Sequence, residues 1–193
     1  MVNVVLAGVG GQGAVLTARI LAETALSAGY DVKTSEVHGM AQRGGSVVSM
    51  VRWGEKVYSP LIPVGGADYF LAFELLESLR RLEYLSDEGT AIVNEYRLDP
   101  LPVLRGDAQY PEDALNSIRA YVAHLVELDA RRMAAEAGNP RALGSVMLGV
   151  LSVFLDFPTD AWEQAINRFV PAKAREVNLK AFALGRESGA ASV

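Results

Sequence analysis

The sequence predicts a three-layer α/β fold, in which helices cover a mostly parallel sheet that carries a hairpin insertion. Apolar runs typical of buried strands alternate with segments of helical periodicity through the first half of the chain. The first run enters a helix through glycines, which is a Rossmann-like start, and the chain is helical from Arg141 onward. We therefore expect one domain over residues 1–193, with C-terminal helices 141–185 packed on it.

The N-terminal elements are predicted as a strand, a turn, a helix and a second strand. The apolar run Val2–Ala7 ends in glycines and is followed by alanines and leucines spaced for one helix face. Gly29 is placed to end that helix. Tyr30–Glu36 then has the pattern of a second strand.

A hairpin is predicted next. Ser46–Trp53 is apolar on both faces, and Gly54-Glu55-Lys56 provides a turn into Val57–Ser59, which we expect to pair with it. Ala67–Phe73 is predicted as a further strand that leads directly into a leucine-rich amphipathic helix, with Thr90–Asn94 as the next strand.

The second half is predicted to contain one more strand and then helices. His124–Leu128 reads as a short buried strand, so we expect His124 to be a core residue rather than a ligand. The predicted helices span Asp129–Ala137, the almost wholly apolar Leu143–Leu155, a segment opened by Thr159 or Asp160, and Ala172–Leu184.

Composition excludes several classes of function. The chain has a net charge of −5 and no run of Lys or Arg, so nucleic acid is not an expected partner. No apolar stretch is long enough to span a bilayer and no basic segment precedes the first apolar run, so we expect a cytoplasmic protein without a membrane partner. Cysteine is absent, which excludes disulfides, thiol nucleophiles and cysteine-ligated clusters held by this chain alone. The two histidines have no metal-ligand spacing, and no metal site is predicted.

A glycine motif follows the first strand. Gly8, Gly10 and Gly13 match G-x-G-x-x-G, and the helix that follows presents free N–H groups to an anion. Glu36 ends the second strand, where a ribose-binding acid of an NAD site would lie. An NAD-dependent enzyme is one interpretation of this motif; a tight turn that packs the helix closely on the strand is another.

A polar loop then argues against NAD. The second strand leads into a glycine-containing loop and not into a crossover helix. This loop brings together His38, Gln42, Arg43 and Ser46 around Gly39, Gly44 and Gly45. A forked cation, an amide and a titratable ring on flexible backbone indicate a binding site. A solvated loop whose arginine pairs with a neighbouring carboxylate is the alternative.

Five stretches together carry a resemblance to a known family. They are GVGGQG from Gly8, EVHGMAQRGGSVVSMVRWG from Glu36, SPLIPVGGAD from Ser59, AIVN from Ala91 and EAGNPRALGSVMLGVL from Glu136. They resemble the gamma-type domain of 2-oxoacid:ferredoxin oxidoreductases, and the HGMAQRGG form resembles most closely the indolepyruvate branch, in its beta subunit. The chain departs from the family pattern at Gly144 and Ser145, where an asparagine is frequent, so no role is carried into that stretch.

The resemblance implies a subunit of an enzyme that oxidatively decarboxylates a 2-oxoacid, namely indolepyruvate or another aryl pyruvate. The acyl group would pass to coenzyme A and the electrons to ferredoxin. Thiamine diphosphate and iron–sulfur clusters would belong to a large partner subunit, and this chain alone would bind no cofactor and have no activity. The absence of cysteine agrees with that division.

The expected site combines the glycine turn with the polar loop, since both follow neighbouring strand ends. We expect Arg43 to attract a carboxylate or phosphate, with His38 and Gln42 orienting ligand or partner groups. The residues expected to contact the cofactor or ligand are Gly8, Gly10, Gly11, Gln12, Gly13, Gly44, Gly45 and Ser46. The alternative is that this whole surface only contacts the partner, in a subunit of assembly without a catalytic role.

Overall fold

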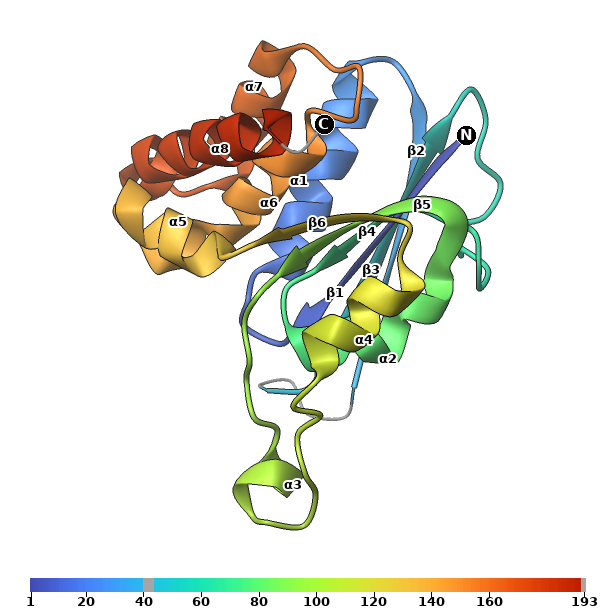
Figure 1. Cartoon of the computed structure of the whole chain (residues 1–193). Helices are drawn as coiled ribbons and strands as arrows, with labels where there is room; N and C mark the ends of the chain where they lie inside the picture. The colour runs from blue at the N-terminus through green and yellow to red at the C-terminus, as the bar shows by residue number, and fades with distance from the viewer. Residues whose placement is uncertain (40–43, 192–193) are drawn as a thin grey trace.

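A six-stranded sheet with the strand order β2-β3-β1-β4-β5-β6 forms the centre of the protein (Figure 1). The computed structural model describes residues 1–39 and 44–191. The strands are β1 (Val2–Val9), β2 (Asp31–His38), β3 (Ser46–Gly54), β4 (Ala67–Ala72), β5 (Leu85–Asn94) and β6 (His124–Leu128). Neighbouring strands β1, β4, β5 and β6 pair in parallel, whereas β3 is antiparallel to both β1 and β2. Only β3 runs against the others, which confirms a mostly parallel sheet.

Helices cover both faces of this sheet. They are α1 (Ala14–Ser27), α2 (Leu75–Arg81), α3 (Leu101–Leu104), α4 (Ala114–Tyr121), α5 (Ala130–Ala137), α6 (Leu143–Leu151), α7 (Thr159–Phe169) and α8 (Arg175–Ala190). One face packs against α1, α5, α6, α7 and α8, and the other against α2 and α4 (Figure 1). The three-layer α/β fold is therefore confirmed. In the described part of the chain, no helix combines the length and the apolar character needed to cross a membrane.

The alternation of side chains along β1 explains why its sequence is apolar throughout. Val4 and Leu6 point into the core beneath the larger helical layer, while Val5 and Ala7 point into the core beneath α2 and α4. All four side chains are fully buried. A central strand covered on both faces needs apolar residues at every position, as the sequence of β1 has.

The structure corrects the predicted partner in the hairpin. Val57–Ser59 forms no strand, and β3 pairs instead with β2, from which it is separated only by the polar loop. Both edges of β3 are occupied, by β1 and β2, so no edge is free for a further strand. The Val57 N–H donates to Asp31 Oδ2 at 2.9 Å, which satisfies this backbone group outside any sheet. The antiparallel β2–β3 connection also differs from the helical crossover of a simple Rossmann half.

Two further details differ from the predictions. His124 is exposed, and not a core residue, because it begins the edge strand β6, of which only Val126 and Leu128 are buried. The apolar segment predicted as a helix over Leu143–Leu155 is helical only as far as Leu151.

Candidate functional site

The site lies at the edge of the sheet where β1, β2, β4, β5 and β6 have their carboxyl ends, the edge at which open α/β sheets bind ligands. The glycine turn follows β1 there, and the polar loop joins β2 to β3. The Gly10 N–H donates to the Gly45 carbonyl at 2.8 Å, and the Gly44 N–H donates to the Gly10 carbonyl at 3.4 Å. The two segments are thus joined by backbone hydrogen bonds into one surface.

The glycine turn has a backbone conformation that glycine adopts at little cost. Gly11 and Gly13 have φ angles of 101° and 92°, in the left-handed region. Gly13 immediately precedes α1, and no side chain caps this helix. The first N–H groups of α1 have no intrahelical acceptor and carry the positive end of the helix dipole, so this end of the turn is suited to an anion.

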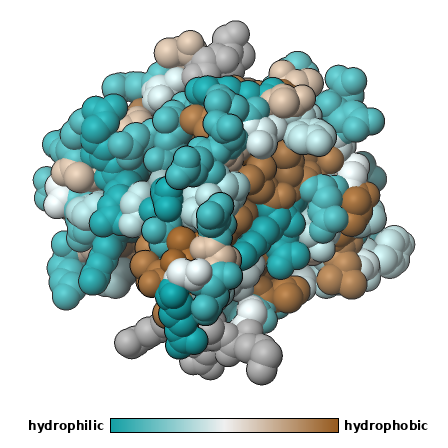
Figure 2. All heavy atoms as spheres, turned by 60° about the horizontal axis from the view of Figure 1, so that its bottom comes forward, coloured by the Kyte–Doolittle hydropathy of each residue, from teal (hydrophilic) through white to brown (hydrophobic). Residues whose placement is uncertain are grey.

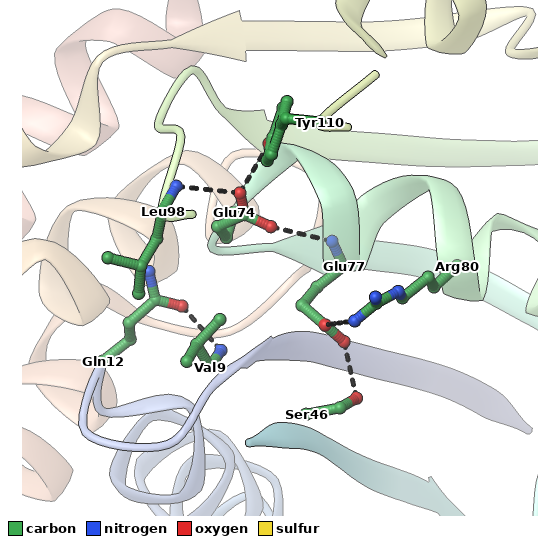
Figure 3. Close-up of polar contacts among 8 residues, drawn as sticks. All are labelled: Val9, Gln12, Ser46, Glu74, Glu77, Arg80, Leu98 and Tyr110. Carbon is green, nitrogen blue, oxygen red and sulfur yellow. Dashed lines mark hydrogen bonds and ion pairs between the residues drawn. The ribbon is translucent and has the colours of Figure 1, made fainter. Parts of the chain in front are cut away.

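Gly8 and Gln12 make internal contacts instead. A Cβ atom on Gly8 would lie 2.9 Å from the Phe73 Cβ. The glycine therefore allows Phe73, which lies between β4 and α2, to approach β1 closely. The Gln12 Oε1 accepts the Val9 N–H at 2.7 Å (Figure 3). The Gln12 Nε2 donates to the Phe73 carbonyl at 3.3 Å. Gln12 therefore holds the turn against the end of β4.

Asn94, the last residue of β5, also ties strand ends together and was not predicted as part of the site. Its fully buried amide donates to the Phe73 carbonyl at 3.0 Å and accepts the Ala130 N–H at 2.9 Å, at the start of α5. Only its place at the end of an apolar run, in AIVN, marked this asparagine in the sequence.

We expect Asn94→Ala to lower the free energy of unfolding by about 2 kcal/mol, because a buried N–H loses its acceptor and a carbonyl loses a donor. Urea denaturation followed by circular dichroism measures this change. Asn116→Ala is the matched control, since Asn116 is exposed on α4 and its loss should cost less than about 0.5 kcal/mol. Equal stabilities of the two variants would contradict this role for Asn94.

Two buried carboxylates, which the sequence did not reveal as site residues, are hydrogen-bonded to residues of this region (Figure 3). Glu77 is 3% exposed; it accepts the Ser46 hydroxyl at 2.5 Å and pairs with Arg80 at 2.7 Å. Glu74 is 1% exposed, and one of its oxygens accepts the Glu77 N–H at 2.9 Å. The Ser46 hydroxyl therefore anchors the start of β3 to α2.

The other oxygen of Glu74 accepts the Tyr110 hydroxyl at 2.6 Å. Burial and this hydrogen bond to Glu74 both raise the pKa of Tyr110. Because the neutral phenol is the form that can donate to the carboxylate, the raised pKa extends this bond to a more alkaline pH than an ordinary tyrosine would allow.

Two hollows flank the glycine turn. The first, of about 430 Å³, is lined by the turn, the start of α1, Arg19, His38 and Phe169. His38 Nε2 lies 3.5 Å from Glu36 Oε2, and Arg19 Nε lies 3.9 Å from Glu36 Oε1. Glu36 therefore places negative charge beside both basic groups, and this hollow has little surplus positive charge.

The second hollow, of about 450 Å³, is more basic and was not predicted. Gly10–Gly13 line one side, and Tyr96, Arg131 and Arg141 line the other. The Arg131 guanidinium lies 4.8 Å from the centre of the Tyr96 ring. Within residues 1–39 and 44–191, neither arginine lies within ion-pair distance of a carboxylate. Two guanidinium groups without a carboxylate partner, opposite the backbone of the glycine turn, suit a phosphate.

The predicted site residues thus have different positions. Gly10, Gly11 and Gly13 line both hollows, and His38 lines the first. Gly8, Gln12 and Ser46 make internal contacts, as described above, and Gln12 also lines the second hollow. Gly44 and Gly45 hold the loop to the turn through backbone bonds. Gln42 and Arg43 lie outside the described residues.

Comparison with known proteins gives consistent matches over almost the whole chain. The sequence pattern of the family described as pyruvate ferredoxin/flavodoxin oxidoreductase matches residues 3–188. The chain is 42% identical to the indolepyruvate oxidoreductase subunit IorB of Pyrococcus horikoshii, covering 95% of this chain and 93% of that protein. It is 40% identical to the subunit of the same name from Archaeoglobus fulgidus, covering 95% and 92%.

A solved structure of a related subunit has the same fold. The crystal structure of the gamma subunit of a keto/oxoacid ferredoxin oxidoreductase from Geobacter sulfurreducens superposes with a TM-score of 0.74. The match covers 99% of each chain at 23% sequence identity. At this sequence identity, the structural similarity shows only that the fold is shared.

Proposed function

We propose a function from the premise that this chain belongs to the pyruvate ferredoxin/flavodoxin oxidoreductase family. We infer that it is the small subunit of an indolepyruvate:ferredoxin oxidoreductase. The observation that carries this proposal is the 42% identity to a subunit named for indolepyruvate, sustained over 95% of the chain. The same name recurs among relatives from other organisms at 36–41% identity.

In the proposed reaction, the bond between the carboxylate and the carbonyl carbon of an aryl 2-oxoacid breaks with loss of carbon dioxide. The acyl group forms a thioester with coenzyme A, and two electrons pass to ferredoxin. Thiamine diphosphate supplies the carbanion chemistry, and iron–sulfur clusters supply electron transfer. This chain does not fit an iron–sulfur cluster, since its sequence has no cysteine. We assign both groups to a large partner subunit.

The contribution that we propose for this chain is the binding of coenzyme A at the second hollow. Arg131 and Arg141 face the glycine turn there, and a guanidinium can donate two parallel hydrogen bonds to one phosphate group. The backbone of the glycine turn, Gly10–Gly13, lines the other side of this hollow. Arg43 is proposed to bind a carboxylate or phosphate from the polar loop, while His38 and Gln42 orient ligand or partner groups.

A role in assembly alone is the second candidate, and one observation favours it. The Gln12 amide and the Ser46 hydroxyl were both expected to contact the ligand. Gln12 is instead hydrogen-bonded to the backbone of Val9 and Phe73, and Ser46 to the carboxylate of Glu77. In that case the surface would contact the partner without contacting coenzyme A.

Co-purification with the large subunit tests the proposed function. We expect the chain alone to be folded, colourless and inactive, and the complex to reduce ferredoxin only when indolepyruvate and coenzyme A are both present. Absorbance spectra and anaerobic ferredoxin reduction measure these outcomes. Oxidation of a 2-oxoacid by the chain alone, or a visible chromophore bound to it, would show that the assignment is wrong.

A further inference from the structure

An extended arm projects from the body at the same edge of the sheet as the glycine turn (Figure 1). It comprises residues 95–110, between β5 and α4, and includes the single turn α3. Leu98, Leu101 and Leu104 are 37%, 63% and 67% exposed on it. Exposed leucines at a projecting tip add no core packing and are costly in water, which is typical of a surface that another molecule covers.

One buried carboxylate is hydrogen-bonded to both ends of the arm. Glu74 Oε1 accepts the Leu98 N–H at 3.0 Å from one end of the arm and the Tyr110 hydroxyl at 2.6 Å from the other (Figure 3). Arg97 pairs with Asp99 at 2.6 Å and lies 4.3 Å from the centre of the Tyr110 ring.

Two prolines restrict the arm further. Pro100 precedes α3 and Pro102 lies within it, and each fixes its own φ angle. An arm that is ordered before binding loses less conformational entropy when it docks. The arm is therefore built as a preformed binding element.

A hollow of about 500 Å³ lies between the arm and the body. Its apolar lining includes Leu76, Leu98, Leu101 and Leu104. It also reaches Val9, at the end of β1, and Gly44 of the polar loop. Figure 2 turns this edge toward the viewer and shows apolar residues exposed among hydrophilic ones. The arm, the hollow and the glycine turn are therefore parts of one continuous face.

We propose that the arm and this hollow are the docking surface for the large subunit, which inserts apolar side chains between the arm and the body. The inference rests on the proposed function. A stable interface buries roughly 800 Å² of surface on each partner, and the few side chains at the tip have far less surface than that. A second copy of this chain docked on the tip alone would therefore bind too weakly. A large partner that closes over the glycine turn covers the hollow as well. Val9 lines both this hollow and the one beside the start of α1, and the Gly44 N–H, at the rim of the hollow under the arm, donates to the Gly10 carbonyl of the turn.

The double variant Leu101→Glu, Leu104→Glu tests this surface in the full chain. We expect the dissociation constant for the large subunit to rise about tenfold or more, as loss of central apolar contacts does. Both side chains are exposed, so the melting temperature of the isolated chain should not change. Leu61→Glu, Val64→Glu is the matched control, with side chains 58% and 64% exposed at the opposite edge of the sheet.

The outcomes separate the inference from the proposed function. Failure of the unmodified chain to bind the large subunit would overturn both. Binding by the unmodified chain and equally tight binding by the arm variant would overturn the docking surface alone. Analytical ultracentrifugation of the isolated chain gives a further check: a dimer that the arm variant abolishes would assign the arm to a second copy and also overturn the inference.

Discussion

Gly185→Ala is expected to destabilise the protein by about 3 kcal/mol, although alanine is normally the better helix former by about 1 kcal/mol. Gly185 lies in α8 where this helix crosses α6, and a Cβ atom there would lie closer than 3.0 Å to the Val146 carbonyl oxygen. The same holds for Gly149 in α6 against the Phe182 carbonyl. Because the obstructing atoms are backbone, relief requires the helices to move apart.

Thermal unfolding measures this effect, and a fall in melting temperature of roughly 6–12 °C is expected for a chain of this size. Gly149→Ala should have a similar cost. Glu187→Ala is the control, since Glu187 is exposed on the same helix and its loss should change stability by less than about 0.5 kcal/mol. A Gly185→Ala protein as stable as the control would mean that α6 and α8 are not in such close contact.

The double variant Arg131→Gln, Arg141→Gln is expected to raise KM for coenzyme A about 100-fold in the assembled complex. Both guanidinium groups line the second hollow without a carboxylate partner among the described residues, so each is free to bind a phosphate. A charge-assisted hydrogen bond is worth roughly 1.5–3 kcal/mol, and about 1.4 kcal/mol corresponds to a tenfold change. Glutamine keeps some hydrogen-bonding capacity but has no charge.

Arg132→Gln is the matched control for this experiment. Arg132 neighbours Arg131 on α5, but it pairs with Glu136 at 2.8 Å and is exposed. We expect it to leave KM for coenzyme A unchanged, and the double variant to leave KM for indolepyruvate unchanged. If the double variant forms an intact complex with normal KM for coenzyme A, the hollow does not bind this substrate and the assembly role gains support.

Local chain properties predicted most of the strands and helices, and with them the three-layer α/β class. The continuous apolar run of β1 predicted a strand buried on both faces, and Val4, Val5, Leu6 and Ala7 are all fully buried. The leucine pattern after Ala67–Phe73 predicted α2, which begins at Leu75. Signals of this kind depend on neighbouring residues only, and are therefore readable without a structure.

Pairing between segments that are distant in the sequence could not be predicted from such local patterns. The partner of β3 depended on which strands occupy its two edges, and β2 and β1 leave no place for Val57–Ser59. Whether His124 is buried or exposed depended on where β6 lies in the sheet. Because β6 is an edge strand, His124 is exposed. Sequence alternation describes a strand but does not say what covers it.

The site shows the same division. The sequence by itself determined the glycine turn, because positive φ angles at Gly11 and Gly13 require that residue type locally. It also determined, through the absence of cysteine, that this chain alone offers no thiolate ligand for an iron–sulfur cluster. Only the tertiary structure brought Arg131 and Arg141 to face that turn, and gave the Gln12 amide and the Ser46 hydroxyl to internal hydrogen bonds. The physical reason is that the chemical character of a side chain belongs to the residue itself. The group to which that side chain is hydrogen-bonded depends instead on how distant segments pack, and the pattern of residues along the chain does not specify this packing.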